Sequence, residues 1–366
     1  MESGKITERQ MVMIMLTITL ITAMFFMPQL TARAVAQDAW IVPHLINLFL
    51  IPVVLIAIGL ASYFPGKSFP EILELLLGRP LGKTICFLYA MWLVMNSSWI
   101  IRETGVFLNV VAYAEAPVMG LMLAILAVVL YATRLGVEAW VRVNDVVLPF
   151  ILIALLAIIL LPLNQINPRQ ILPIGEHSFG SMMKPALVGS ALRAQVFLAL
   201  YLLPLVSNPR RPALKLIGIS IGVSIVISVL NLVMVLVFGA VAVGQFEFPF
   251  FSLARVISLA RIIDRLEILI VAIWVVGIFV KACLFFYCSA TSLARIFDLN
   301  DYKILIYPLG ILILALADNS FRGINDLGIF FGKVQPGMAM IFEFMIPAAL
   351  LAAAMVRFRN RKAVAE

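Results

Sequence analysis

The most unusual chemical group in this sequence is a lysine in the middle of a long apolar run. Lys281 lies within WVVGIFVKACLFFYCSATSLARIF (274–297), and no other charged residue occurs from Ile268 to Ala294. In a helix that rises about 1.5 Å per residue, its amine would lie roughly 20 Å from either end. A lysine at the centre of a membrane helix costs about 2.5–3.5 kcal/mol to insert. We therefore predict a functional role for Lys281, as a fixed cation or a proton-linked switch.

Other polar or small residues occur at the same depth in three further apolar runs. Lys281 itself is expected to face the first run, 11–32, and to bond carbonyl groups freed where that run bends. The predicted ligand-binding residues are Thr19, Thr22, Ala23, Asn96, Ser97, Gly189, Ser190, Arg193 and Gly277, with Lys281 as a coupling or structural cation.

These residues also have structural explanations. Threonines in membrane helices often bond their own backbone, and Arg193 and Lys281 could belong to structural ion pairs. A pocket containing both cations would suit a carboxylate, although Glu103 or Glu343 could neutralise it.

The composition places the chain in a membrane. Of its 366 residues, 63% are hydrophobic and 13% are charged, whereas soluble domains have about 45–50% apolar and 25% charged residues. Continuous apolar runs favour helices over a β-barrel. The net charge of +8 is explained by basic loops and does not indicate a nucleic acid partner. The sequence has no HExxH motif, no nucleotide-binding loop and no clustered metal ligands, so we predict no enzyme, metal or cofactor.

Ten apolar runs predict an all-α polytopic membrane protein with a single transmembrane domain, 1–366. The ten predicted spans are 11–32, 41–63, 84–112, 117–133, 146–163, 185–206, 216–244, 268–294, 304–317 and 337–356.

The polar first and sixth spans suggest two five-span halves related by an inverted repeat, because such repeats place broken first helices at the midplane. The predicted repeats are about 8–163 and 184–358. A helix break is expected in the sixth span near Pro185, Gly189 and Ser190. A short interfacial helix is predicted at about 250–264, where basic residues alternate with apolar ones.

Several motifs resemble the B-subunit family of spore nutrient-germinant receptors, within the amino acid–polyamine–organocation superfamily. They are AQDAW, FPGKSFPEILELLLGRPLGK, LPLVSNPRRP and IWVVGIFVKACLFFY, in matching order along nearly the whole chain. The resemblance implies a LeuT-type fold and a location in the inner membrane of an endospore. It also implies an A-type membrane subunit and a lipoprotein C-subunit as partners, and recognition of small germinants such as amino acids. The bulky stretch Thr22 to Met27 departs from the glycine-rich unwound segment of related transporters.

Two functions are compatible with the sequence. The first is a receptor subunit, in which a germinant bound between the first, third, sixth and eighth spans biases a conformational equilibrium. The second is a proton- or cation-coupled amino acid transporter that uses the same pocket.

The loops predict that both termini are cytoplasmic, because this orientation places roughly twice as many lysine and arginine residues on the cytoplasmic side as outside. In cells carrying Lys362→Cys, we expect a membrane-impermeant maleimide to label the new cysteine only after permeabilisation. Arg169→Cys, in a predicted outer loop, should be labelled in intact cells. The opposite pattern would contradict this orientation.

Overall fold

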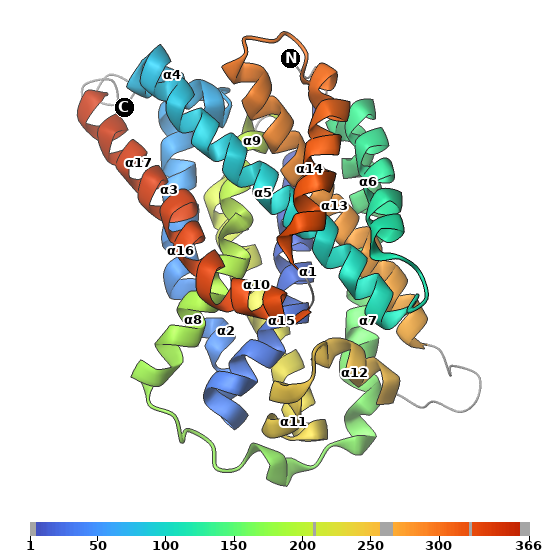
Figure 1. Cartoon of the computed structure of the whole chain (residues 1–366). Helices are drawn as coiled ribbons and strands as arrows, with labels where there is room; N and C mark the ends of the chain where they lie inside the picture. Colours follow the sequence, from blue (N-terminus) through green and yellow to red (C-terminus); the bar gives the residue numbers. More distant parts are fainter. Residues whose placement is uncertain (1–4, 208–209, 257–265, 322–323, 359–366) are drawn as a thin grey trace.

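A computed structural model describes residues 5–207, 210–256, 266–321 and 324–358. Ten helical segments of this part of the chain are long and apolar enough to cross a membrane, which confirms the predicted number. The N-terminus and the end of α17 lie at the same end of the helical bundle, where α4 also lies (Figure 1). We call this end the termini face and the other end the opposite face.

The first five spans contain most of the helices between the N-terminus and the loop that precedes α8. They are α1 (Glu8–Val35) with η1 (Ala36–Trp40), α2 (Val42–Leu45) with α3 (Asn47–Tyr63), α5 (Arg79–Val111), α6 (Val118–Leu135), and α7 (Val137–Leu160) with η2 (Leu161–Gln165). The short helices α4 (Phe69–Leu77) and η3 (Pro168–Ile171) lie in connections.

The second five spans include more short helical pieces. They are α8 (Phe179–Arg193) with η4 (Ala194–Leu198), α9 (Ala199–Leu202) and η5 (Leu203–Leu205); α10 (Pro212–Phe238); α13 (Leu266–Ile296); η6 (Tyr302–Leu305) with α14 (Ile306–Ser320); and η7 (Phe330–Val334), α16 (Gln335–Ala339), η8 (Met340–Met345) and α17 (Ile346–Arg357). The connecting helices are α11 (Ala240–Gln245), α12 (Pro249–Val256) and α15 (Ile324–Ile329).

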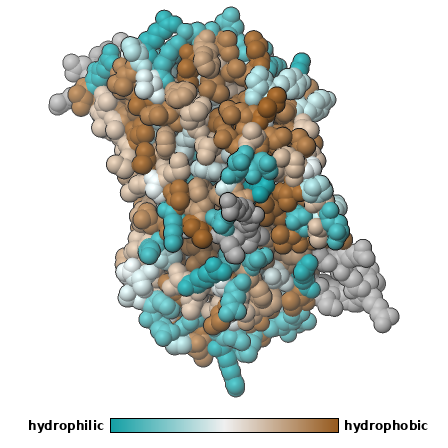
Figure 2. Space-filling model, viewed as in Figure 1, coloured by the Kyte–Doolittle hydropathy of each residue, from teal (hydrophilic) through white to brown (hydrophobic). Residues whose placement is uncertain are grey.

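Burial separates four central spans from six outer ones. In the spans built on α1, α5, α8 and α13, 67–83% of the apolar window is buried, whereas the share is 28–50% in the others. The outer helices carry exposed leucine, isoleucine, valine and phenylalanine side chains. Figure 2 shows apolar residues over much of the side of the molecule, with hydrophilic residues gathered towards its two ends. The core that can hold a site is therefore formed by α1, α5, α8 and α13.

The fifth span starts earlier than predicted. The sequence placed its start at residue 146, but α7 begins at Val137 and directly follows Gly136, whose φ of +105° allows the reversal from α6. Glu138 accepts a bond from the backbone of Lys5, and Asp145 accepts one from Gln10. These charged residues, which suggested a loop, form the first turns of a helix at the termini face.

The sixth span breaks close to the predicted position, but the first does not break. α8 ends at Arg193 and continues as the tighter helix η4, a few residues after Gly189 and Ser190. In contrast, α1 runs without interruption from Glu8 to Val35 and contains Pro28. No break therefore divides α1, and Pro28, which has no N–H, leaves the carbonyl of Met24 without its helical partner.

An aromatic cluster fills the core near the opposite face. Phe25 of α1, Phe107 of α5 and Trp274 of α13 have ring centroids 4.2–5.0 Å apart. Phe248 and Phe250 add two more rings to Phe25 at 5.8 Å. Phe250 lies in the first turn of α12. This helix therefore packs onto α1 and α13 at the position where the interfacial helix is predicted to begin. Residues 257–265 of that prediction lie outside the described residues, and the interfacial position remains a prediction.

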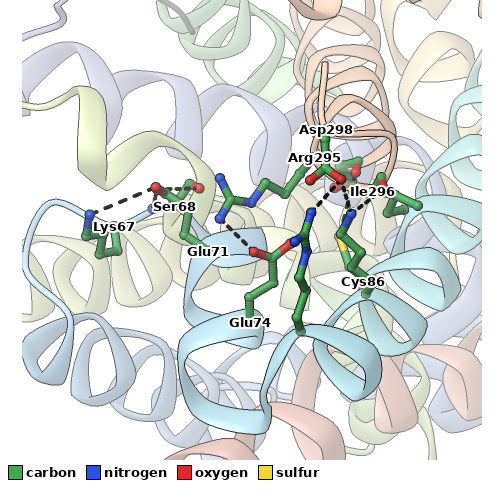
Figure 3. A network of polar contacts seen from close by, with 11 residues as sticks. Lys67, Ser68, Glu71, Glu74, Cys86, Arg295, Ile296 and Asp298 are labelled. Atoms are coloured by element: carbon green, nitrogen blue, oxygen red, sulfur yellow. Dashed lines mark hydrogen bonds and ion pairs between the residues drawn. The ribbon is translucent and has the colours of Figure 1, made fainter. Parts of the chain in front are cut away.

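α4 and the first turns of α5 join the end of α13 through ion pairs at the termini face (Figure 3). Glu74 of α4 pairs with Arg295 at 2.6 Å, and Asp298, just beyond α13, pairs with Lys83 at 2.6 Å and Arg79 at 2.9 Å. We call these three ion pairs the α4 clasp. Hydrogen bonds from Lys83, and then from Arg79, hold the pKa of Asp298 below its ordinary value.

The α4 clasp predicts unequal effects for two neutralising changes. Glu74→Gln should lower the free energy of unfolding by about 1–2 kcal/mol, because it weakens a charge-assisted hydrogen bond of the partly buried Arg295. Asp298→Asn should have a smaller effect that high salt abolishes, because this carboxylate is exposed. The Asp298 contribution should be complete at neutral pH and disappear as the pH falls through its lowered pKa.

Thermal unfolding of the detergent-solubilised chain at low and high salt would measure both effects. Equal losses for the two variants, or a salt-independent loss for Asp298→Asn, would contradict the assignment.

Candidate functional site

Lys281 faces α1, as the sequence predicted. Its side chain is buried, and the Nζ amine donates a hydrogen bond of 2.9 Å to Thr22 Oγ1. The Thr22 hydroxyl in turn donates to the carbonyl of Ile18 at 3.1 Å. The bond from Lys281 therefore goes to a side-chain hydroxyl, whereas the sequence predicted a freed backbone carbonyl.

Two buried carboxylates accompany Lys281. Glu103 of α5 and Glu343 of η8 are 3% and 0% exposed, and both interact electrostatically with the lysine. All four carboxylate oxygens lack a hydrogen-bond partner among the described residues. Glu343 lies in a π-helical segment, a distortion that is frequent at functional sites. We call Glu103, Lys281 and Glu343 the charged triad.

Neither carboxylate belonged to the predicted set of ligand-binding residues. The sequence suggests a role for them only as groups that could neutralise a basic pocket. A signal for Glu343 was present, because it interrupts the apolar run MAMIFEFMIPAALL in the way that Lys281 interrupts its own. Glu103 lies next to Arg102, and such adjacent charges also occur where a helix leaves the membrane.

The other two residues predicted on α1, Thr19 and Ala23, are buried, and the hydroxyl of Thr19 bonds within the helix. Thr19 donates to Met15 O at 2.7 Å, as expected of a threonine that bonds to the backbone of its own helix and has a structural role. Ala23 is fully buried next to Thr22. Thr17, one turn from Ile21, donates to Asn144 Oδ1 of α7 at 2.7 Å and so joins two helices.

The predicted pair on α5 lies in the same core. Asn96 donates to Trp92 O at 2.8 Å, and Ser97 donates to Leu93 O at 2.9 Å. The hydroxyl groups of Ser97 and Ser289 on α13 are 3.5 Å apart. Ser97 therefore belongs to the contact between α5 and α13, the helix that carries Lys281, whereas Asn96 bonds within α5.

Arg193 lies apart from the charged triad. Its guanidinium donates to Ser224 Oγ at 2.8 Å and to Ser220 O at 2.5 Å, both on α10. The side chain is 1% exposed, and no carboxylate of the described residues forms an ion pair with it. The sequence predicted its depth, but not that it would face α10.

Ser190 lines a small apolar cavity on another side of α8. The cavity has a volume of about 110 Å³ and lies between α3, α8 and the α16–η8 segment. Its lining residues are Leu48, Phe49, Leu50, Pro52, Val53, Leu187, Ser190, Ala191, Ala194, Pro336, Ala339, Met340 and Phe344. The predicted residues of α8 thus divide between this cavity and the α10 contact.

The two predicted glycines lie at close helix contacts. A Cβ atom at Gly189 would lie 2.7 Å from Ile46 Cδ1 and Met27 Cε, and one at Gly277 would lie 2.5 Å from Ile21 Cδ1. Both glycines therefore allow a neighbouring side chain to approach the backbone closely. A direct role for either glycine in ligand binding stays a prediction.

A larger polar cavity opens at the termini face. Its volume is about 540 Å³, within the range typical of small-molecule pockets. The lining residues are Gly66, Ser68, Pro70, Glu71, Tyr201, Pro204, Leu205, Tyr287, Thr291, Ala294, Arg295, Asp298, Leu299, Asn300 and Tyr302. Figure 3 shows that Glu71, Arg295 and Asp298 belong to the polar network around α4. Sequence reasoning missed this cavity, because polar residues near helix ends are common and do not mark a site.

Together, these features describe a helical membrane protein with charged groups at the centre of its core, a polar cavity at one face and aromatic packing at the other. Polar and charged groups at such depth mark ligand or ion pathways. The architecture is that of the LeuT-type transporters. It is similar to Mhp1, a nucleobase-cation-symport-1 family transporter solved with bromovinylhydantoin bound, with a TM-score of 0.67, 10% identity and coverage of 97% of this chain and 92% of Mhp1. It is also similar to MhsT in complex with L-phenylalanine, with a TM-score of 0.65, 13% identity and coverage of 97% and 89%.

The sequence itself belongs to the spore germination protein family, whose model matches residues 5–318. The chain is 23% identical to spore germination protein KB of Bacillus subtilis (strain 168), covering 99% of this chain and 98% of that protein. It is 21% identical to spore germination protein YndE of the same organism, covering 98% and 99%. The predicted family and LeuT-type fold are thus confirmed, and the family and its structural neighbours are permease-like proteins, not enzymes.

The packing around Gly277 leads to a prediction about its role. Gly277→Ala should lower the free energy of unfolding by about 1–3 kcal/mol, because the added methyl group overlaps Ile21 and the core must shift. The matched control is Gly218→Ala on α10, where a Cβ atom meets nothing within 4 Å. Thermal unfolding of both purified variants would measure the difference. If Gly277→Ala were as stable as the control, the glycine would have free space beside it.

Proposed function

We propose that this chain is the membrane subunit of a spore nutrient-germinant receptor and that it binds a small germinant, an amino acid, in the centre of the bundle. The observation that carries this proposal is the bond between Lys281 of α13 and Thr22 of α1, with Glu103 and Glu343 nearby. A charged centre at the contact of two central helices is expected of a solute site. Family membership supports a role in germination.

The chemistry of this centre favours an amino acid. Lys281 offers a cation to a carboxylate, and Glu103 and Glu343 offer acceptors to an ammonium group. MhsT, which has a similar fold, is solved with L-phenylalanine. Arg193 would serve as a second carboxylate ligand if its side chain left Ser220 and Ser224.

The proposal extends to location and partners. The chain would lie in the inner membrane of the endospore with both termini cytoplasmic, so that the termini-face cavity opens towards the spore core. It would assemble with an A-type membrane subunit and a lipoprotein C-subunit. Ligand binding would favour one conformation of the bundle, and the partner subunits would respond to that conformation.

An amino acid transporter is the alternative function, with a proton or another cation as coupling ion. The similarity to Mhp1 and MhsT favours it, as does the combination of a polar cavity at one face with aromatic packing at the other. Uptake of radiolabelled amino acids by the purified chain in liposomes separates the two functions. A receptor subunit would show binding without net uptake, and a transporter would accumulate its substrate.

The position of Lys281 predicts a function that does not depend on sodium, because its ammonium group acts as a fixed cation between α1 and α13. In spores that carry Lys281→Ala as their only copy, the germination response should fall about tenfold or more, equivalent to at least 1.4 kcal/mol of lost interaction. In spores with the original chain, replacing sodium by choline should leave the response unchanged.

The matched control is Lys184→Ala, because Lys184 is exposed at the start of α8. Immunoblots of spore membranes should show equal amounts of both variants, since removal of a buried charge makes insertion easier. A fully responsive Lys281→Ala spore would refute the assigned role of the lysine, as would a sodium requirement of the original chain.

A further inference from the structure

The charged triad contains an odd number of charges. Lys281 contributes one positive charge when protonated, and Glu103 and Glu343 contribute two negative charges when ionised. Their side chains are 2%, 3% and 0% exposed. A fully ionised triad would therefore place one unbalanced negative charge in the low-dielectric core, where an isolated charge is very unfavourable.

The other cations within the spans do not supply the missing charge. The Arg102 side chain points to the end of α14, where it donates to Phe321 O at 2.9 Å and pairs with Asp318 at 3.6 Å. Arg193 bonds to α10. Thr22 of α1 faces Lys281 with a hydroxyl, and Tyr89 of α5 donates its hydroxyl to the carbonyl of Phe342, next to Glu343.

Hydrogen bonding makes the imbalance more unfavourable. None of the four oxygens of Glu103 and Glu343 accepts a bond from a described residue. Lys281 donates to Thr22, and no ion pair within 4.0 Å joins it to either carboxylate among the described residues. A buried carboxylate without donors is far less stable than the neutral acid. One proton on one of the two carboxylates would balance the triad.

Contacts between α5 and α13 show how the three groups are ordered. The two helices are antiparallel, because Phe107 contacts Trp274 while Cys86 bonds to Ser292 O. Lys281 therefore lies between these two levels. Glu103 is four residues, about one turn, from Phe107 and thus lies on the side of the aromatic cluster.

Glu343 lies on the other side of the lysine, towards the termini face. Its neighbour Phe342 stacks on Trp92 at 5.3 Å and accepts a bond of 2.6 Å from the hydroxyl of Tyr89. Tyr89 and Tyr201 both pack against Phe69, and Tyr201 lines the termini-face cavity. Two buried tyrosine hydroxyl groups thus lie between the triad and that cavity, within ring packing around Phe69. On the other side of the triad, the rings of the aromatic cluster carry no hydroxyl group.

We infer that Glu103, Lys281 and Glu343 form a proton site that holds one exchangeable proton and is reached from the termini-face cavity. The proton comes from water, adds to one carboxylate to give the neutral acid, and returns to water when it leaves. Glu103 and Glu343 share this proton, and Lys281 balances whichever carboxylate remains ionised. This inference rests on the proposed site at the centre of the bundle and deepens it by adding a bound proton. For the alternative transporter function, that proton would be the coupling ion.

Infrared spectroscopy of the full chain in liposomes tests the inference without any germinant, so its failure is distinguishable from failure of the proposed function. Protonated carboxyl groups give a separate carbonyl band that shifts in deuterated water. We expect a band from one core carboxyl group at neutral pH that disappears as the pH rises and is the same in sodium and in choline. Glu103→Gln and Glu343→Gln should each abolish it, because the remaining carboxylate is balanced by Lys281.

Lys281→Met provides the sharpest arm of this test. Without the lysine, two carboxylates need two protons, so the band should double in intensity. Combining this change with Glu103→Gln should restore a single band, which keeps the test usable if Lys281→Met alone does not fold. The matched control, Glu115→Gln, removes an exposed loop carboxylate and should change nothing.

Three outcomes would overturn the proton site. The first is the absence of a protonated core carboxyl at neutral pH in the original chain. The second is a band that depends on sodium, which would assign the site to a metal cation. The third is an unchanged band in Lys281→Met, which would mean that the lysine does not balance the carboxylates.

Discussion

The bond between Lys281 and Thr22 connects two of the four central spans, α13 and α1. Its effect on how these helices pack is large because the bond lies in the core of a membrane protein. In water, a single amine–hydroxyl bond would matter little, because solvent competes for both groups. In the core, the ammonium group has few alternatives, so the contact fixes how α13 faces α1. Close packing at Gly277 serves the same contact, since it lets Ile21 approach the backbone of α13. The positions of α5 and η8 follow, because each brings a carboxylate to the lysine.

Much of the architecture could be predicted because the bilayer imposes it. Ten apolar runs became ten membrane-crossing segments, and the depth of Lys281 indicated that it faces the interior. The rotation of the central helices was beyond sequence reasoning. The apolar window of the span built on α8 is 83% buried, so the pattern around Arg193 shows no polar face, and the direction of Arg193 towards α10 depends on the packing of neighbours. The start of α7 was predicted too late because charged residues at its start suggested a loop. These residues are helical, since a membrane helix can extend by several turns beyond the apolar region.

The two faces of the bundle differ in a way that bears on either proposed function. Near the opposite face, the bundle is closed by contacts among the rings of Phe25, Phe107 and Trp274. At the termini face, a polar cavity of about 540 Å³ is open. In both proposed functions, the ligand shifts an equilibrium between two conformations of the bundle. It does so only as far as its affinities for the two conformations differ. A receptor and a transporter can share this machinery. They differ in whether the solute leaves at the other side.

α13 passes through all three regions that define the molecule. Trp274 joins the aromatic cluster, Lys281 belongs to the charged triad, and Arg295 takes part in the α4 clasp. The helix is continuous from Leu266 to Ile296, so one rigid element connects these three contacts. A small tilt about the level of Lys281 would move its two ends in opposite directions. If a change of charge at Lys281 tilted the helix in this way, the contacts of Trp274 and of Arg295 would change together.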